Sequence, residues 1–144
     1  MDKRLWLKIA AGWSFFMAAC QTVISVSPAA AAFFRAPPPL LEDRWRLFWV
    51  GEAAAVILVI FGLYALSGAG SIRRLPLLRL GLIGISCLYL SRGLFFILSV
   101  LIVLGILKGE LLIQGEISTL VFLAAGISYA VGTVLNWRDM QVRR

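Results

Sequence analysis

Long runs of apolar residues dominate the chain, and polar residues gather in short segments between them. Four runs are long enough to cross a membrane as helices, and they extend over residues 5–27, 47–66, 80–107 and 117–137. A helix rises about 1.5 Å per residue, so about 20 apolar residues cross the hydrocarbon core of a bilayer. The strands of a membrane barrel would alternate polar and apolar residues, and these runs do not alternate. The pattern therefore predicts four transmembrane helices.

The composition indicates that lipid, rather than water, surrounds most of the chain. Hydrophobic residues make up 61% of the 144 residues and charged residues make up 15%. A soluble protein has about 25% charged residues, and a soluble fold of this size has too much surface to hide so much apolar material. We expect a single transmembrane domain over residues 1–144, which is an all-α, integral membrane four-helix bundle.

The one long connection, residues 28–46, is rich in proline. Three consecutive prolines at 37–39 favour polyproline geometry and interrupt any continuous helix there. Phe33 and Trp45 are aromatic residues of the kind that lie at membrane interfaces. We expect this outer loop to lie against the membrane surface.

Lysine and arginine are distributed unequally between the two sides that four crossings define. One side carries nine of them: Lys3, Arg4, Lys8, Arg73, Arg74, Arg79, Arg138, Arg143 and Arg144. The other side carries four: Arg35, Arg44, Arg46 and Lys108. Because cytoplasmic segments are enriched in these residues, both termini are expected to be cytoplasmic. Arg73, Arg74 and Arg79 are also expected to touch anionic lipid headgroups.

The first apolar run has a second interpretation, a cleaved secretory signal peptide. It follows a basic start, and the alanines at 29–31 offer small residues for cleavage. Its apolar part is longer than the roughly 7–15 residues that are usual in a signal peptide. We therefore expect a helix that is retained.

Two charged residues, Glu52 and Arg92, lie inside predicted crossings. A charge at the bilayer centre costs about 2.5–3.5 kcal/mol on insertion scales, so such residues usually face a partner or water. Because these two crossings are neighbours in the chain, we expect Glu52 and Arg92 to contact each other. The contact would be either an ion pair that fixes helix packing or a proton or substrate site. A third alternative is that Glu52 only extends outward to the interface.

Two of the runs carry a stripe of small and polar residues at helical spacing. The stripes are Ser14, Ala18, Gln21 and Ser25 in the first run, and Ala125, Tyr129, Gly132 and Asn136 in the last. Residues at this spacing lie on one helix face. Such faces usually serve helix packing and interhelical hydrogen bonding. The alternative is a polar path through the interior, lined by Ser14, Gln21, Ser25, Tyr129 and Asn136.

Few residues could support catalysis. The chain has no histidine, which excludes histidine-ligated metal sites and histidine-based acid–base catalysis, and its serines lack a neighbouring base. Cys20 and Cys87 lie in separate runs without a C-x-x-C pair, so we expect them to be small buried hydrophobes. The basic residues form no stripe, which argues against nucleic acid as a partner. We expect no enzyme activity, no metal and no cofactor.

The stretch Gly62–Leu94 contains GLYALSGAGSIRRLPLLR and is followed, with overlap, by LYLSRGLFF. These motifs resemble a set of short bacterial inner-membrane proteins that share an LYALSGAG-x-IRRLPLLR hinge and an arginine in the next span. The resemblance covers about a quarter of the chain, and the residues it maps onto are Arg73, Arg74 and Arg92. It implies a four-span protein of a bacterial inner membrane and carries no activity.

Two functional hypotheses follow. The first is a non-enzymatic accessory or scaffold protein that packs with membrane lipids, a membrane-protein partner or a second copy of itself. The second is a small proton- or cation-coupled transporter or channel that uses Glu52 and Arg92. A transporter should place these groups around a water-accessible cavity, whereas a scaffold should seal its polar groups against each other.

Overall fold

The computed structural model describes residues 4–33, 38–73, 75–105 and 113–138, and all regular secondary structure in these ranges is helical. The helices are α1 (Leu5–Val26), α2 (Pro28–Phe33), α3 (Pro38–Leu41), α4 (Arg44–Gly68), α5 (Leu78–Val103) and α6 (Ile113–Asn136). The predicted all-α class is confirmed.

Three segments within the described residues are long and apolar enough to cross a membrane, namely Leu5–Val26, Arg44–Gly68 and Thr119–Asn136. They correspond to the first, second and fourth predicted crossings, as expected of a membrane protein. The third predicted crossing coincides with α5, a helix of 26 residues. That α5 also crosses the membrane stays a prediction.

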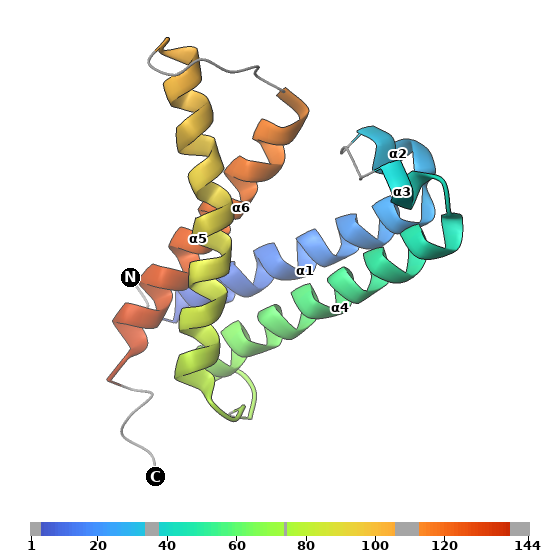
Figure 1. The fold of residues 1–144 in the computed structure, drawn as a ribbon. Coiled ribbons are helices and arrows are strands. Elements are labelled where there is room, and N and C mark those ends of the chain that lie inside the picture. Colours follow the sequence, from blue (N-terminus) through green and yellow to red (C-terminus); the bar gives the residue numbers. More distant parts are fainter. Residues whose placement is uncertain (1–3, 34–37, 74, 106–112, 139–144) are drawn as a thin grey trace.

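The long helices form two hairpins, α1 with α4 and α5 with α6, and the most extensive contacts in the molecule are made within these pairs. Figure 1 shows the hairpins crossing near the start of α1 and the end of α6, and separating towards the end that carries α2 and α3. Contacts of α1 with α6 and of α4 with α5 are fewer. A compact four-helix bundle is therefore not confirmed.

Close approach of the helices depends on glycine at several places, and two of them show how the hairpins are held. A Cβ atom at Gly51 of α4 would overlap the Cβ atom of Ser25 in α1. A Cβ atom at Gly132 of α6 would lie 2.7 Å from Cγ of Leu7 in α1. The first glycine brings the two helices of one hairpin together, and the second brings the two hairpins together.

The proline-rich connection contains the two short helices α2 and α3, so the polyproline geometry expected at 37–39 is wrong for Pro38 and Pro39. Pro38 begins α3, because proline has no N–H to lose in the first turn of a helix. Residues 34–37 of this connection lie outside the described residues. Phe33 and Trp45, the expected interface aromatics, are both exposed.

Candidate functional site

Polar groups from all four long helices meet in the core. Ser14 Oγ of α1 lies 2.7 Å from the Tyr129 hydroxyl of α6 and 3.1 Å from the Tyr89 hydroxyl of α5. The Tyr129 hydroxyl donates a hydrogen bond to the backbone carbonyl of Phe61 in α4, at 2.8 Å. We call this set, Ser14, Tyr89, Tyr129 and the Phe61 carbonyl, the hydroxyl junction.

The proton positions in the hydroxyl junction follow from counting donors. The Phe61 carbonyl can only accept, so it takes the single Tyr129 hydroxyl proton. Ser14 must then donate to Tyr129, and Tyr89 must donate to Ser14. The protons point in one direction, from Tyr89 through Ser14 and Tyr129 to Phe61. Every hydroxyl in the junction is therefore matched.

The hydroxyl junction is sealed. Ser14 and Tyr129 are 0% exposed and Tyr89 is 2% exposed. The Tyr89 and Tyr129 rings stack with their centroids 5.3 Å apart and their planes 19° apart. This geometry can hold four helices in one register, and all three hydroxyl-bearing residues of the junction are buried.

The sequence places Ser14 and Tyr129 in the polar stripes and leaves Tyr89 open between helix packing and a polar path, and it does not identify the Phe61 carbonyl. The signal for Tyr89 is its spacing from Leu82 and Ile85, which places all three on one face of α5. All three are buried. No sequence signal marks the carbonyl, because every residue carries one.

Glu52 faces α1. Its Oε1 atom accepts a hydrogen bond from Ser25 Oγ at 2.6 Å, and Ser25 Oγ also lies 2.8 Å from the backbone carbonyl of Thr22. Ser25 is 1% exposed. Gly51 allows this contact, because it brings α4 directly against Ser25.

Arg92 lies on α5 with a different partner. Its guanidinium carbon is 5.4 Å from the ring centroid of Phe122 in α6, and its side chain is exposed. The expected Glu52–Arg92 contact is therefore replaced by two separate contacts. The reason is the packing order: the Glu52 end of α4 packs on α1, and the hairpin that carries Arg92 diverges from it (Figure 1). Among the described residues the ion pair is that of Arg46 with Asp43, at 3.2 Å.

The remaining polar residues of the two stripes are placed differently from each other. Gln21 is half-buried on α1. Asn136 is buried near the end of α6, where its side-chain amide donates to the Gly132 carbonyl at 2.8 Å. Neither belongs to the hydroxyl junction, so the stripes do not form one continuous polar path.

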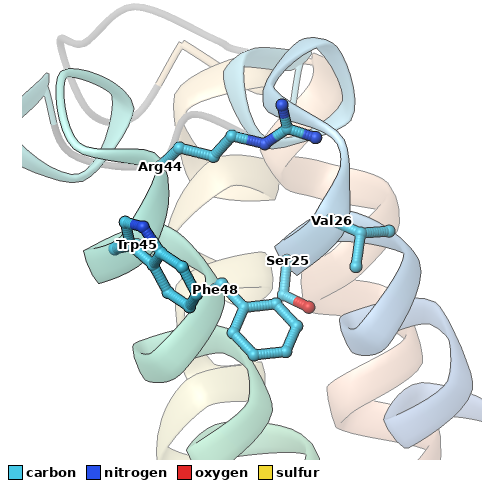
Figure 2. Close-up of a pocket in the computed structure, with 5 residues that line it drawn as sticks. All are labelled: Ser25, Val26, Arg44, Trp45 and Phe48. Atoms are coloured by element: carbon cyan, nitrogen blue, oxygen red, sulfur yellow. The ribbon is translucent and has the colours of Figure 1, made fainter.

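A cavity of about 490 Å³ lies between the end of α1 and the start of α4. Its lining residues are Ser25, Val26, Arg44, Trp45 and Phe48, and we call it the Arg44 cavity. Figure 2 shows the Arg44 side chain extending from α4 towards the end of α1, above the Phe48 ring and Ser25. In the sequence, Arg44 stands out only as a topology residue.

Polar contacts on both sides of the connection between α4 and α5 hold this connection and the end of α6 in place. Ser67 Oγ accepts from the Leu75 backbone N–H at 2.9 Å and donates to the Arg73 carbonyl at 3.1 Å. Arg79 donates to the Trp137 carbonyl at 3.1 Å, and its guanidinium lies 4.7 Å from the centroid of that ring. Arg79 thus binds the end of α6, where a cation is favourable. Arg74 lies outside the described residues.

The cysteines differ from expectation. Cys20 and Cys87 are free thiols, and both are exposed on their helices, whereas we expected them to be buried. In the part of the chain that the structure describes, no three His, Cys, Asp or Glu side chains gather as metal ligands would.

Comparisons with models of known protein families, with curated proteins and with solved structures find no match for this chain. The candidate sites are therefore the hydroxyl junction, the Ser25–Glu52 contact and the Arg44 cavity, judged on their own geometry.

Proposed function

We propose that the chain is a non-enzymatic integral membrane protein that acts as an accessory or scaffold protein, packing with lipid or with a membrane partner. The proposal includes four crossings of a bacterial inner membrane and two cytoplasmic termini. It includes no catalytic residue, cofactor or nucleic-acid partner. The sealed hydroxyl junction is the observation that supports it. A transport path needs polar groups that face water, and here Ser14 and Tyr129 are 0% exposed and face each other.

The exposed position of Arg92 supports the presence of a membrane partner that covers this residue. It is exposed on α5, a helix otherwise apolar over most of its length, and its described contact is with an aromatic ring. A charged residue within a crossing is costly when it faces lipid and is usually covered by protein or water. We therefore expect the Arg92 face of α5 to pack against a membrane partner or a second copy.

The competing function is a proton- or cation-coupled transporter or channel. One observation favours it: Glu52 is joined through Ser25 to the wall of the Arg44 cavity. A flux assay in proteoliposomes separates the two functions. We expect proton and potassium flux at background for the wild type, for Glu52→Gln and for the matched control Glu42→Gln.

A transporter would give a different pattern. In that case the wild type would show flux above background. Glu52→Gln would lower this flux and Glu42→Gln would retain it, and the transporter function would then replace the scaffold function. Glu42 is a suitable control because it is exposed and precedes α4. The membrane topology has its own test: the chain should resist alkaline carbonate extraction, and tags on both termini should react from the cytoplasmic side.

A further inference from the structure

The Arg44 cavity combines one cation with apolar walls. Arg44 lies at its rim, and Val26, Trp45 and Phe48 form much of its lining. Trp45 is 70% exposed and Val26 is 50% exposed, so the cavity opens on the surface of the α1–α4 hairpin. Its volume of about 490 Å³ lies within the range of small-molecule sites.

Arg44 supplies a positive charge that its neighbours do not neutralise. The adjacent Asp43 accepts hydrogen bonds from the Trp45 and Arg46 backbone N–H groups and pairs with the Arg46 side chain at 3.2 Å. Within the described residues, Arg44 belongs to no ion pair. Glu52 lies eight residues further along α4, and its carboxylate accepts a hydrogen bond from Ser25, a residue that lines the cavity. The part of the cavity that favours an anion is therefore the Arg44 end, which Figure 2 shows above Ser25.

The rest of the cavity favours a hydrocarbon chain. Trp45 and Phe48 stand edge to face, with ring centroids 6.5 Å apart, and they line the cavity from α4. Ser25, which lines it from α1, has its hydroxyl proton engaged by Glu52 and the Thr22 carbonyl. Beyond Arg44 the cavity therefore offers mainly apolar contact.

We propose that the Arg44 cavity binds one anionic phospholipid, with the phosphate on Arg44 and an acyl chain running between Phe48 and Val26. An arginine guanidinium matches phosphate oxygens in pairs, and an interfacial tryptophan is suited to the headgroup level. This inference rests on the membrane location proposed above, but it does not depend on the absence of transport. It names the lipid class that the scaffold would hold.

Native mass spectrometry of the full-length protein in detergent tests the proposal. The protein is titrated with phosphatidylglycerol and with phosphatidylcholine of the same acyl chains. We expect a one-to-one phosphatidylglycerol complex with a Kd about tenfold lower than that of phosphatidylcholine. Arg44→Gln should weaken phosphatidylglycerol binding about tenfold. The matched control Arg46→Gln removes the same charge two residues away and should change the Kd less than about twofold, because Arg46 is paired.

A second pair of variants tests the cavity rather than the charge. Val26→Trp should fill the cavity and weaken phosphatidylglycerol binding while Arg44 remains. Val23→Trp is the control, because Val23 is also exposed on α1 and does not line the cavity. The melting temperature of each variant is compared with that of the wild type, so that a loss of lipid binding can be distinguished from a loss of folding.

Four outcomes would overturn the proposal. If Arg44→Gln and Arg46→Gln lose the same phosphatidylglycerol affinity, the lipid responds to general surface charge. If Arg44→Gln and Val26→Trp both bind phosphatidylglycerol as tightly as the wild type, the lipid binds elsewhere. Displacement of the lipid by inorganic phosphate would assign the site to a soluble anion, and tighter binding of oleate would assign it to a free fatty acid. If any of these occurs while the chain still resists carbonate extraction and shows background flux, the proposed function stands without this site.

Discussion

The hydroxyl junction joins all four long helices, whereas the Arg44 cavity lies between α1 and α4 alone, and the two regions use polar groups in opposite ways. In the junction, each hydroxyl donates to a group on another helix, and the tyrosines and Ser14 are buried. At the cavity, Arg44 is exposed and takes part in no ion pair within the described residues. Matched polar groups fix which helices pack together, whereas an unmatched charge beside an apolar cavity is available to a ligand.

The largest effect on stability is expected from a substitution that breaks the contact between the hairpins, close to the hydroxyl junction. Gly132→Ala places a Cβ atom 2.7 Å from Cγ of Leu7 and 3.1 Å from its backbone N. Because α1 and α6 must then separate, we expect the free energy of unfolding to fall by about 1–3 kcal/mol. Unfolding in mixed micelles with increasing SDS measures it, and lipid binding in the Arg44 cavity should be unchanged.

Gly12→Ala is the matched control for Gly132→Ala. A Cβ atom at Gly12 of α1 meets no atom within 4 Å. Since alanine is the better helix former, this change should be neutral or should stabilise the protein by up to about 1 kcal/mol. Equal destabilisation by the two variants would contradict the importance of this crossing.

The proton order in the hydroxyl junction predicts a second, smaller effect. Tyr129→Phe removes two hydrogen bonds and leaves the Ser14 proton without its acceptor, so we expect a loss of about 1–2 kcal/mol. Tyr89→Phe removes only a terminal donor and should cost about 0.5–1 kcal/mol. Tyr64→Phe, at a hydroxyl bonded to the Pro76 carbonyl near the surface, is the control.

The same SDS unfolding assay measures these tyrosine variants. If Tyr89→Phe costs as much as Tyr129→Phe, the hydroxyl protons do not run from Tyr89 through Ser14 to Tyr129. If both resemble Tyr64→Phe, the junction contributes packing alone, and its contrast with the Arg44 cavity disappears.

The positions of the helices could be predicted from the sequence more readily than the pairs of helices that pack against each other. The first predicted crossing, 5–27, matches α1 within one residue, because the length of an apolar run is a local property. The predicted Glu52–Arg92 contact was wrong, because the sequence does not determine whether the first turns of α4 pack on α1 or on α5. Glu52 bonds to Ser25 of α1 instead.

The two cysteines show a second limit of sequence reasoning. In water, an apolar residue is driven inward, so Cys20 and Cys87 were expected to be buried. In lipid this driving force is absent, and the inward faces of helices are distinguished by small and polar residues instead. Both cysteines are exposed, whereas Ser14 is 0% exposed. Polarity was thus the better guide to the interior of this chain.

The smallest expected effect concerns the rim of the Arg44 cavity. Asp43 caps α4 by accepting from the Trp45 and Arg46 backbone N–H groups, and Asp43→Ala removes this cap together with an exposed ion pair. We expect the free energy of unfolding to fall by about 1 kcal/mol or less, because a lost cap dominates and an exposed pair contributes little. Glu42→Ala, one residue earlier and exposed, should change it by less than about 0.5 kcal/mol. If Asp43→Ala destabilises the protein as much as Gly132→Ala, the cavity end contributes as much to stability as the hairpin crossing, and the division between a packing region and a ligand region fails.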